Sequence, residues 1–407
     1  MNRSSKVWKC WHITLVTIIV ITISLSTSSL GSTTDNSFLA KEKITFEDDF
    51  KTHIDESFEE DMNYSNTINQ EFDTLVAHWG GKYANYYAGS YISNRQFTIL
   101  VTCDPEEVQN EIWNVTQDHN ISVKKAKYSY DYLCDIQNQI TELITDLQSE
   151  NNEVAKNVIG IGVDEIENEV FVEVLYLNDT KREEVESILE PFQEIHLISK
   201  DRPYQETTRK VTAGTDRWVY NSTLGGYSTI GFCATRVNSS GVTEKGFVTA
   251  GHSGNNTNTM KISGTNVGKV SWRKYGGNCD ALFVNMNSYP NSDFVRSNIL
   301  STNYTIASTS SVGVVGSAYA LHGKSSGIIS GTVNNKSFSF TMNGHSFTDH
   351  IRMNMSVVTG DSGGPLVKTI SGNVKSIVGI CSCGDGTYSN FSKVTNILNQ
   401  MNGSLYT

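Results

Sequence analysis

Several features that would assign the protein to a class at once are missing from its 407 residues. No spacing of cysteine and histidine resembles a zinc site. Basic residues are not in excess, and the formal net charge of −11 argues against nucleic-acid binding. The apolar run of residues 13–25 is too short to span a bilayer comfortably. With 38% apolar residues, the chain can still build two or three domains with sizeable cores.

Acidic residues are nearly absent from the second half of the chain. Residues 31–210 carry 36 Asp and Glu against 15 Lys and Arg, whereas residues 211–407 carry 7 against 14. Opposite charges of this kind indicate two domains that recognise each other. The alternative is that the acidic half serves solubility alone. If long-range attraction joins the halves, added salt should weaken their association.

The first thirty residues have the composition of a targeting segment. Basic residues precede the apolar run, and Ser29 and Gly31 have the spacing that signal peptidases prefer. We therefore expect residues 1–31 to be a signal peptide and the protein to be secreted, with no stable membrane anchor. The alternative is an uncleaved anchor, because a clean A-x-A motif is missing.

Cysteines and glycosylation motifs agree with a secretory route. Two cysteines fall in the acidic half and four in the basic half, so each half can form its own bridges. A bridge between Cys381 and Cys383 is the least favoured pairing, because alternate residues of a strand point to the same face. Sequons for N-glycosylation, of which some are chance matches in so Asn- and Ser-rich a sequence, include Asn221, Asn238, Asn303, Asn335 and Asn390.

The acidic half alternates helical and extended patterns. Apolar residues recur at helical spacing in residues 47–79 and 128–148, and a further helix is expected over residues 180–189, with Asp179 as its N-cap. Strands are expected over residues 96–102, 157–164 and 169–177, which are rich in β-branched side chains. No set of catalytic residues occurs here, so the half is expected to serve binding or folding.

From about residue 209 the pattern becomes one of short strands. Ten short apolar runs separated by Gly, Ser, Thr and Asn lie between residues 228 and 383. This spacing is typical of an all-β barrel or sandwich. Only residues 391–401 have helical periodicity, with Val394, Ile397, Leu398 and Met401 on one face.

Three residues among these strands can carry nucleophilic chemistry. His252 follows the run K-G-F-V-T-A-G, Asp280 precedes another apolar run, and Ser362 stands in V-V-T-G-D-S-G-G-P-L-V-K. A serine hydroxyl becomes a good nucleophile when an imidazole takes its proton, and a carboxylate orients that imidazole. The backbone N–H groups of Gly360 and Ser362 can then serve as an oxyanion hole. A side chain at Gly363 or Gly364 would crowd the substrate or require a disfavoured dihedral angle.

At these residues the chain resembles the trypsin-like serine proteases, whose triad has the order His, Asp, Ser. The closer resemblance is to the bacterial branch that includes α-lytic protease and the streptogrisins, through G-F-x-x-T-R followed by K-G-F-V-T-A-G-H in residues 231–254. Three segments of the acidic half, residues 78–102, 127–140 and 161–175, are similar to the long pro-region of that branch.

The resemblance implies a fold and a division into domains. Residues 211–407 would form an all-β catalytic domain of two antiparallel Greek-key six-stranded β-barrels with a C-terminal helix. Residues 32–210 would be an α+β pro-region, which acts as an intramolecular folding catalyst and then as an inhibitor. The linker of residues 199–210 is the expected maturation site, although it could be a plain surface loop, and the mature chain would start near Val211.

The resemblance also assigns roles to residues. Ser362 would be the nucleophile, His252 the general base and then acid, Asp280 the orienting carboxylate, and Gly360 and Ser362 the oxyanion hole. Substrate contacts would come from Ser356, Thr359, Ser382, Cys383 and Gly384, with Ser382 also touching the buried aspartate. Ser356 stands at the base of the specificity pocket and is not an aspartate, so an apolar or aromatic residue before the scissile bond is favoured over Arg or Lys. Cys381 replaces the histidine of glutamate-specific relatives.

Departures from the family leave two points open. Ser253 and Ser228 or Thr229 stand where the family has a disulfide, and a bridge between Cys233 and Cys279 is one possible substitute. Thr359 replaces an arginine that supports the aspartate before the nucleophile, so the support of Asp361 is open. A new N-terminus at Val211 is one candidate, although the bacterial branch matures without such a switch.

These observations predict a secreted, monomeric serine endopeptidase made as a zymogen, acting on peptide or protein substrates. His345 and His350 lack a third ligand and are interpreted as surface or strand residues, and no metal or organic cofactor is implied. Two alternatives are a catalytically silent binding module with the same fold and a serine esterase or transferase.

Overall fold

The computed structural model describes residues 56–206, 218–262, 264–288, 305–372 and 374–406. The expected signal peptide, residues 1–31, and the expected new N-terminus at Val211 lie outside these ranges. Within the described ranges, no helix is both long enough and apolar enough to cross a membrane.

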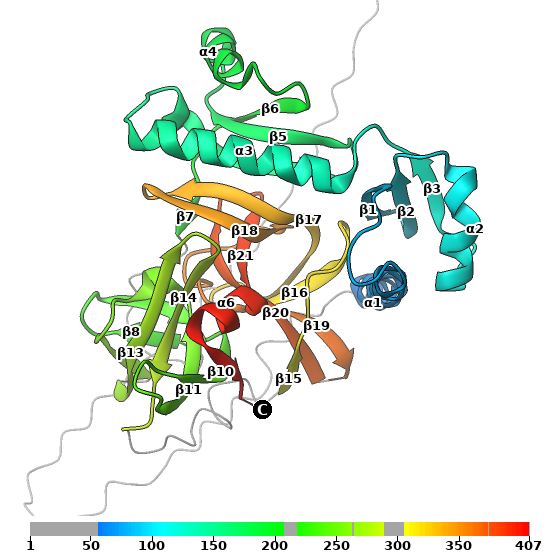
Figure 1. Cartoon of the computed structure of the whole chain (residues 1–407). Coiled ribbons are helices and arrows are strands. Elements are labelled where there is room, and N and C mark those ends of the chain that lie inside the picture. Colours follow the sequence, from blue (N-terminus) through cyan, green and yellow to red (C-terminus); the bar gives the residue numbers. More distant parts are fainter. Residues whose placement is uncertain (1–55, 207–217, 263, 289–304, 373, 407) are drawn as a thin grey trace, which may run out of the picture. The chain divides into compact units, whose positions relative to one another are not determined.

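The acidic region, residues 56–206, is built from helices and strands, as its sequence patterns predict (Figure 1). The structure differs from the prediction in that the helix α2 (Pro105–Thr116) was not expected and the N-cap of α4 is one residue earlier. The side chain of Asn178 accepts a hydrogen bond from the backbone N–H of Lys181 at 2.9 Å, so Asn178 caps α4, and Asp179 is its first helical residue. The elements are α1 (Glu56–His78), β1 (Tyr87–Ser93), β2 (Gln96–Val101), α2 (Pro105–Thr116), β3 (Ser122–Lys125), α3 (Tyr130–Ser149), η1 (Ala155–Asn157), β4 (Val158–Asp164), β5 (Glu169–Leu175), α4 (Asp179–Leu189), β6 (Ile195–Lys200) and β7 (Gln205–Glu206).

The basic region, residues 218–406, is almost entirely β, as expected. Its C-terminal helix, α6, buries Val394, Ile397 and Met401. The elements are β8 (Trp218–Asn221), β9 (Gly226–Thr229), β10 (Phe232–Val237), β11 (Thr243–Thr249), η2 (Gly251–Ser253), β12 (Thr259–Ile262), β13 (Thr265–Gly276), β14 (Cys279–Asn285), β15 (Thr305–Thr309), β16 (Ala318–Gly323), β17 (Gly327–Met342), β18 (His345–Asn354), β19 (Pro365–Ser371), β20 (Val374–Gly384), β21 (Ser389–Lys393), α6 (Val394–Met401) and β22 (Gly403–Leu405).

The strands of the basic region form two curved sheets that are antiparallel except where β15 pairs parallel with β20. The first has the order β22-β10-β11-β14-β13-β12-β8-β9 and is a curled half-barrel. In the second, the order β16-β19-β20-β21-β18-β17 returns to its start through the pairing of β16 with β17, which closes a six-stranded barrel. The expected two-barrel architecture is therefore present, with the second barrel closed by its hydrogen bonds.

The acidic region extends the sheet of the second barrel. β4 pairs with β17 in the register Ser339↔Ile161 and Phe340↔Gly160, and β5 and β6 continue the sheet beyond β4. Gly160 leaves room for two side chains at this pairing, because a Cβ there would lie 2.4 Å from Glu173 Oε2 and 2.6 Å from the ring of Phe338. Both regions contribute to one hydrophobic cluster at this junction, which contains Ile159, Phe171, Tyr204, Phe338, Phe340, Met342, Phe347 and Cys383.

Candidate active site

The histidine and aspartate of the predicted triad lie on neighbouring elements of the first sheet. His252 stands in the short helix η2 directly after β11, and Asp280 is the second residue of β14. The backbone N–H of His252 donates to Asp280 Oδ1 at 3.0 Å, and His252 Nδ1 lies 2.7 Å from Asp280 Oδ2. This approach requires Gly251, because a Cβ there would lie 2.4 Å from the carbonyl oxygen of Lys274 and 2.9 Å from Asp280 Oδ1.

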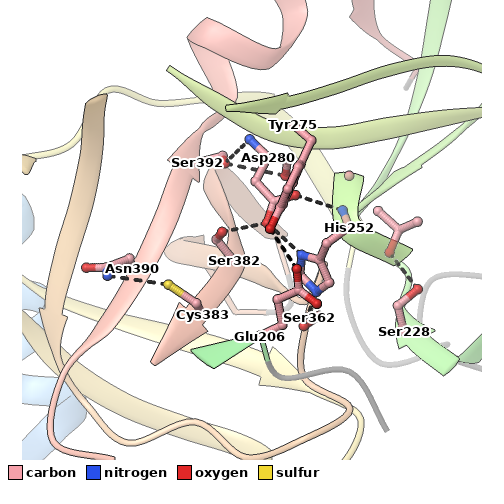
Figure 2. Close-up of polar contacts among 12 residues, drawn as sticks. Glu206, Ser228, His252, Tyr275, Asp280, Ser362, Ser382, Cys383, Asn390 and Ser392 are labelled. Atoms are coloured by element: carbon pink, nitrogen blue, oxygen red, sulfur yellow. Dashed lines mark hydrogen bonds and ion pairs between the residues drawn. The ribbon is translucent and has the colours of Figure 1, made fainter. Parts of the chain in front are cut away.

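The serine completes a continuous chain of hydrogen bonds. His252 Nε2 lies 2.8 Å from Ser362 Oγ (Figure 2). An ionised carboxylate only accepts hydrogen bonds, so Asp280 places the imidazole proton on Nδ1 and leaves Nε2 to accept from the serine hydroxyl. The structure thus brings together the three residues that the sequence singled out, from positions 110 residues apart in the chain.

The charges of the histidine and aspartate shift each other's pKa. Burial alone would lower the pKa of His252, but the charge of Asp280, their hydrogen bond and the charge of Glu206 outweigh it and raise the pKa above its ordinary value. Burial alone would raise the pKa of Asp280, yet His252 and the hydroxyl of Ser382 hold it below its ordinary value. Asp280 is therefore the ionised partner of the pair.

Two serines fix the position of Asp280. As the resemblance implied, Ser382 touches this aspartate: its hydroxyl donates to Asp280 Oδ2 at 2.6 Å. The backbone N–H of Asp280 donates to Ser392 Oγ at 2.9 Å, and Ser392 Oγ lies 3.0 Å from His350 Nε2.

His350 is not a surface residue, contrary to one of the two interpretations from sequence. It lies on β18, as the strand interpretation predicts, but it is fully buried. Its Nδ1 lies 2.9 Å from the carbonyl oxygen of Thr348, which can only accept, so Nδ1 carries a proton. Burial lowers the pKa of this imidazole, which therefore stays neutral and accepts a hydrogen bond from Ser392 at Nε2. His350 thus supports Asp280 through Ser392.

The glycines around Ser362 allow its turn to pack against the first sheet. Gly363 has φ +83°, and a Cβ there would lie 2.2 Å from Thr249 Oγ1 and 2.4 Å from the carbonyl oxygen of Thr229. Crowding by the first sheet, rather than by the substrate, therefore excludes a side chain at this position. At Gly364, a Cβ would lie 2.8 Å from the carbonyl oxygen of Asp361.

Asp361 is supported by hydrogen bonds from the turn between β16 and β17. Its Oδ1 accepts from the backbone N–H groups of Ser325 at 2.9 Å and Ser326 at 3.0 Å. Its Oδ2 accepts from the hydroxyl of Ser326 and from the backbone N–H of Val358 at 3.0 Å. Thr359 stands where the family has an arginine that supports this aspartate, and backbone N–H groups and the hydroxyl of Ser326 support Asp361 instead.

The residues predicted to bind substrate occupy two places. Ser382, Cys383 and Gly384 are buried at the end of β20. Figure 2 shows Ser382 and Cys383 beside the triad. Ser356 and Thr359 are exposed and precede the turn of Ser362.

No sequence motif singles out Glu206 or Tyr275, yet both lie at the triad. Gln205 and Glu206 form the short strand β7, which pairs antiparallel with β20 in the register Gly384↔Gln205 and Cys383↔Glu206. The hydroxyl of Tyr275 donates to Glu206 Oε1 at 2.7 Å. A glutamate in a linker and a tyrosine in a strand carry no motif, so only the fold reveals this contact.

The described residues contain neither a disulfide nor a group of metal ligands. None of the six described cysteines is joined by a disulfide, and Cys233 and Cys279, for which a bridge was one possibility, pack in two different hydrophobic clusters. Among the described residues, no group of three or more His, Cys, Asp or Glu could hold a metal ion.

Solved structures of bacterial serine proteases are similar to part of this chain. The Nocardiopsis protease NAPase is 28% identical over 47% of this chain and 96% of its own, with a TM-score of 0.37. The chymotrypsin of Cellulomonas bogoriensis is 26% identical over 44% of this chain and 91% of its own, with a TM-score of 0.35. The α-lytic protease homologue N4 is 19% identical over 47% and 97%, with a TM-score of 0.36. No family model and no curated protein matches the chain.

These likenesses are partial, and what the site can do follows from its own geometry. A curled half-barrel and a closed barrel carry a serine, a histidine and an aspartate joined by hydrogen bonds of 2.7 and 2.8 Å. This arrangement of fold and site is similar to that of the chymotrypsin-fold serine proteases. Such a site can carry out acyl transfer on a serine.

Proposed function

We propose that the protein is a secreted serine endopeptidase that is made as a zymogen. The observation that carries the proposal is the continuous chain of hydrogen bonds from Asp280 through His252 to Ser362. The further support of Asp280 by Ser382 and by the Ser392–His350 pair orients this chain before substrate binds.

The mechanism assigns one task to each residue. Ser362 Oγ attacks the carbonyl carbon of the scissile peptide bond while His252 Nε2 takes its proton. The tetrahedral intermediate then collapses as His252 gives that proton to the leaving amine, which leaves an acyl-enzyme on Ser362. Water, deprotonated by His252, then attacks the acyl group. The second tetrahedral intermediate breaks its bond to Ser362 Oγ, which takes the proton back from His252, and the acid product leaves. Asp280 stays ionised throughout and stabilises the imidazolium that forms in each step.

The proposed oxyanion hole consists of the backbone N–H groups of Gly360 and Ser362. The carbonyl oxygen of Thr359 accepts from Ser325 Oγ at 2.8 Å, and that of Asp361 accepts from the N–H of Gly364 at 2.7 Å. In a trans peptide the N–H points opposite to the C=O, and the described peptide bonds include no cis bond. The two N–H groups that follow these carbonyls therefore point away from Ser325 and Gly364, which supports their use for an oxyanion.

We propose that the acidic region is a pro-region that inhibits the site until it is removed. Two contacts support this role. β7 adds to the edge of β20 beside the triad, where a peptide substrate would bind, and β4 adds to β17. A peptide segment that occupies the substrate edge blocks the site. The region therefore acts as inhibitor and, by extending the second barrel, as a template for its folding.

The preferred residue before the scissile bond is proposed to be uncharged. Ser356 brings no negative charge to the pocket, so Arg and Lys have no partner there. An apolar or aromatic side chain is the favoured class.

Self-processing provides the test of this function. Intact mass and N-terminal sequencing are measured on the secreted wild type and on Ser362→Ala in parallel. We expect the wild type alone to lose residues up to the 199–210 linker. Processing of neither protein, together with no labelling of Ser362 by a serine-directed fluorophosphonate, would contradict the proposal and favour a catalytically silent module. Turnover of esters without turnover of peptide amides would favour an esterase.

A further inference from the structure

The strand β7 is a peptide segment bound beside the triad, and the contacts of its side chains define a subsite. β7 runs antiparallel to the end of β20, on the edge opposite to the one that pairs with β21. Glu206 pairs with Cys383, the neighbour of Ser382, whose hydroxyl binds Asp280. Along an antiparallel peptide in this register, the residue after the one opposite Cys383 pairs with Ser382. That next residue is the one nearest the triad, so its carbonyl group is the one offered to Ser362.

The side chain opposite Cys383 meets a hydrogen-bond donor from the basic region. Tyr275, on β13, donates its hydroxyl to Glu206 Oε1 at 2.7 Å (Figure 2). The tyrosine ring also packs edge-on against His252, with 6.4 Å between the ring centroids. The contact therefore lies directly beside the imidazole of the triad.

Neighbouring side chains hold Tyr275 in place without any contribution from β7. Its ring packs edge-on against His345 and Phe347, with centroid distances of 4.6 and 5.2 Å. The guanidinium carbon of Arg273 lies 5.0 Å from the ring centroid, and Arg273 Nε donates to the carbonyl oxygen of Gly251 at 2.6 Å. All of these residues belong to the basic region, so the subsite remains when β7 leaves.

Burial, the hydrogen bond to Glu206 and the charge of that carboxylate raise the pKa of Tyr275 well above its ordinary value. The phenol therefore stays protonated and remains a donor at neutral and mildly alkaline pH. A carboxylate is a stronger acceptor for such a donor than a neutral amide. The guanidinium of Arg273 beside the ring adds positive charge, which also favours an anion.

We propose that Tyr275 forms a specificity subsite that selects an acidic side chain at the second residue before the scissile bond. This inference rests on the proposed protease function and adds the class of substrate that the site prefers. Glu206 is the acidic side chain that this chain itself supplies.

The same register predicts the bond that is cut in maturation. If Glu206 is the second residue before the cut, the cut falls between Thr207 and Thr208, which lie outside the described residues and within the expected linker. Thr207 is smaller than the side chains proposed above for this position. Because the cut is intramolecular, position rather than side-chain preference selects the bond.

The test compares two peptides on the matured enzyme. The two fluorogenic peptides are identical except for Glu or Gln at the second residue before the cut, and kcat and KM are measured for each. We expect kcat/KM to be about tenfold higher for the Glu peptide, mainly through a lower KM, because the hydrogen bond forms in the ground state as well. Tyr275→Phe should lose most of this preference, measured as the ratio of kcat/KM for the two peptides on the same variant. In the control pair, Glu and Gln stand one residue earlier, opposite Gly384, and should differ little.

Each result has one interpretation. Equal kcat/KM for the two peptides in wild-type enzyme whose Ser362 reacts with a fluorophosphonate would overturn the subsite and leave the protease function standing. No turnover and no labelling would overturn the protease function and this inference with it. A first residue other than Thr208 in the self-processed chain would overturn the register. The wild-type comparison needs no variant, so it holds even if Tyr275→Phe fails to fold.

Discussion

The acidic and basic regions bury their charges for different purposes. In the acidic region the buried carboxylates Glu165 and Glu173 both pair with cations of the basic region. Lys336 Nζ lies 3.0 Å from Glu165 Oε1, and Arg352 Nη2 lies 2.6 Å from Glu173 Oε1. In the basic region the buried carboxylates Asp280 and Asp361 are held by donors of their own region. The acidic region thus uses these two carboxylates to hold its partner, whereas the basic region uses Asp280 and Asp361 to build a site. A third buried carboxylate of the basic region, Asp385, pairs with Lys200 of the acidic region and also holds the junction.

This contrast changes the meaning of the charge difference in the sequence. Opposite net charges on two surfaces act at long range and are screened by salt. The ion pairs at the junction are desolvated instead, and the ring of Tyr130 lies 4.6 Å from Lys336 Nζ. The burial of these charges stabilises the junction only while each keeps its partner. The attachment of the acidic region therefore depends on a few pairs more than on its net charge.

The largest expected effect is on the chemistry of the basic region. Asp280→Asn places an N–H group where Asp280 Oδ2 now accepts from His252 and Ser382. The imidazole then turns or changes tautomer, and kcat should fall about 10⁴-fold. The variant is matured in trans by the wild-type enzyme and assayed on a peptide amide. A loss of less than tenfold would contradict the role of Asp280, and unchanged unfolding in urea would show that the junction is intact.

The second prediction removes a charge of the acidic region. Glu173→Ala in a Ser362→Ala background leaves the buried guanidinium of Arg352 without its partner. The free energy of unfolding should fall by about 3–5 kcal/mol, measured by urea denaturation of the full chain. The matched control is Glu169→Ala on the same strand, because its side chain is 35% exposed and lies 4.0 Å from His196. That change should cost at most about 1 kcal/mol. Equal losses of unfolding free energy in the two variants would mean that burial of the Glu173–Arg352 pair adds nothing to its effect on stability.

The third prediction concerns the pKa of the triad histidine, where the two regions meet. Glu206 is one of the charges that raise the pKa of His252, so Glu206→Gln should lower it. The titration is followed by NMR of the imidazole protons in full-length Ser362→Ala, with Gln205→Ala as the uncharged control. An unchanged pKa of His252 would mean that the charge of Glu206 has no effect on the titration of this imidazole.

The same shift sets the pH dependence of activity. The general base must be neutral, so kcat/KM rises as the pH rises through the pKa of His252. Because Glu206 departs with the acidic region, this rise in the matured enzyme should occur at lower pH than the titration of His252 in the full chain.

The smallest expected effect is that of salt on the inhibited complex. With residues 31–210 added in trans to the matured enzyme, the association rate should fall as salt screens the opposite net charges. The dissociation rate should change little, because the buried pairs are poorly screened. Stopped-flow fluorescence measures the first rate and recovery of activity after dilution the second. If salt changes neither the association rate nor the dissociation rate, long-range attraction does not contribute to the inhibition.

Much of the fold could be predicted because its signals are local. Alternation in residues 169–177 predicted the strand β5, which ends at Leu175, and the helical spacing in residues 391–401 predicted the helix α6, which begins at Val394. The N-cap of α4 was misplaced by one residue, because Asn178 and Asp179 are both good capping residues and only the backbone direction distinguishes them.

The candidate site was predicted only as far as its motifs extend. His252, Asp280 and Ser362 each stand in a recognisable run of residues. His350, Ser392, Ser325 and Ser326 do not, because a common polar residue in a strand or turn becomes functional only through what the fold places beside it. The hydrogen bond of Tyr275 to Glu206 joins residues 69 positions apart and depends on the register of β7 on β20.

The sequence by itself determined the change from a mixed α and β half to a half of short strands, the three reactive side chains and the charge difference between the halves. Those properties follow from local periodicity, from motifs and from composition. Only the tertiary structure decided which donors hold Asp361, which buried histidine supports Asp280, and which carboxylates cross the junction. Such contacts join distant segments, and their strength depends on burial and on distances of about 3 Å, which the order of residues does not encode locally.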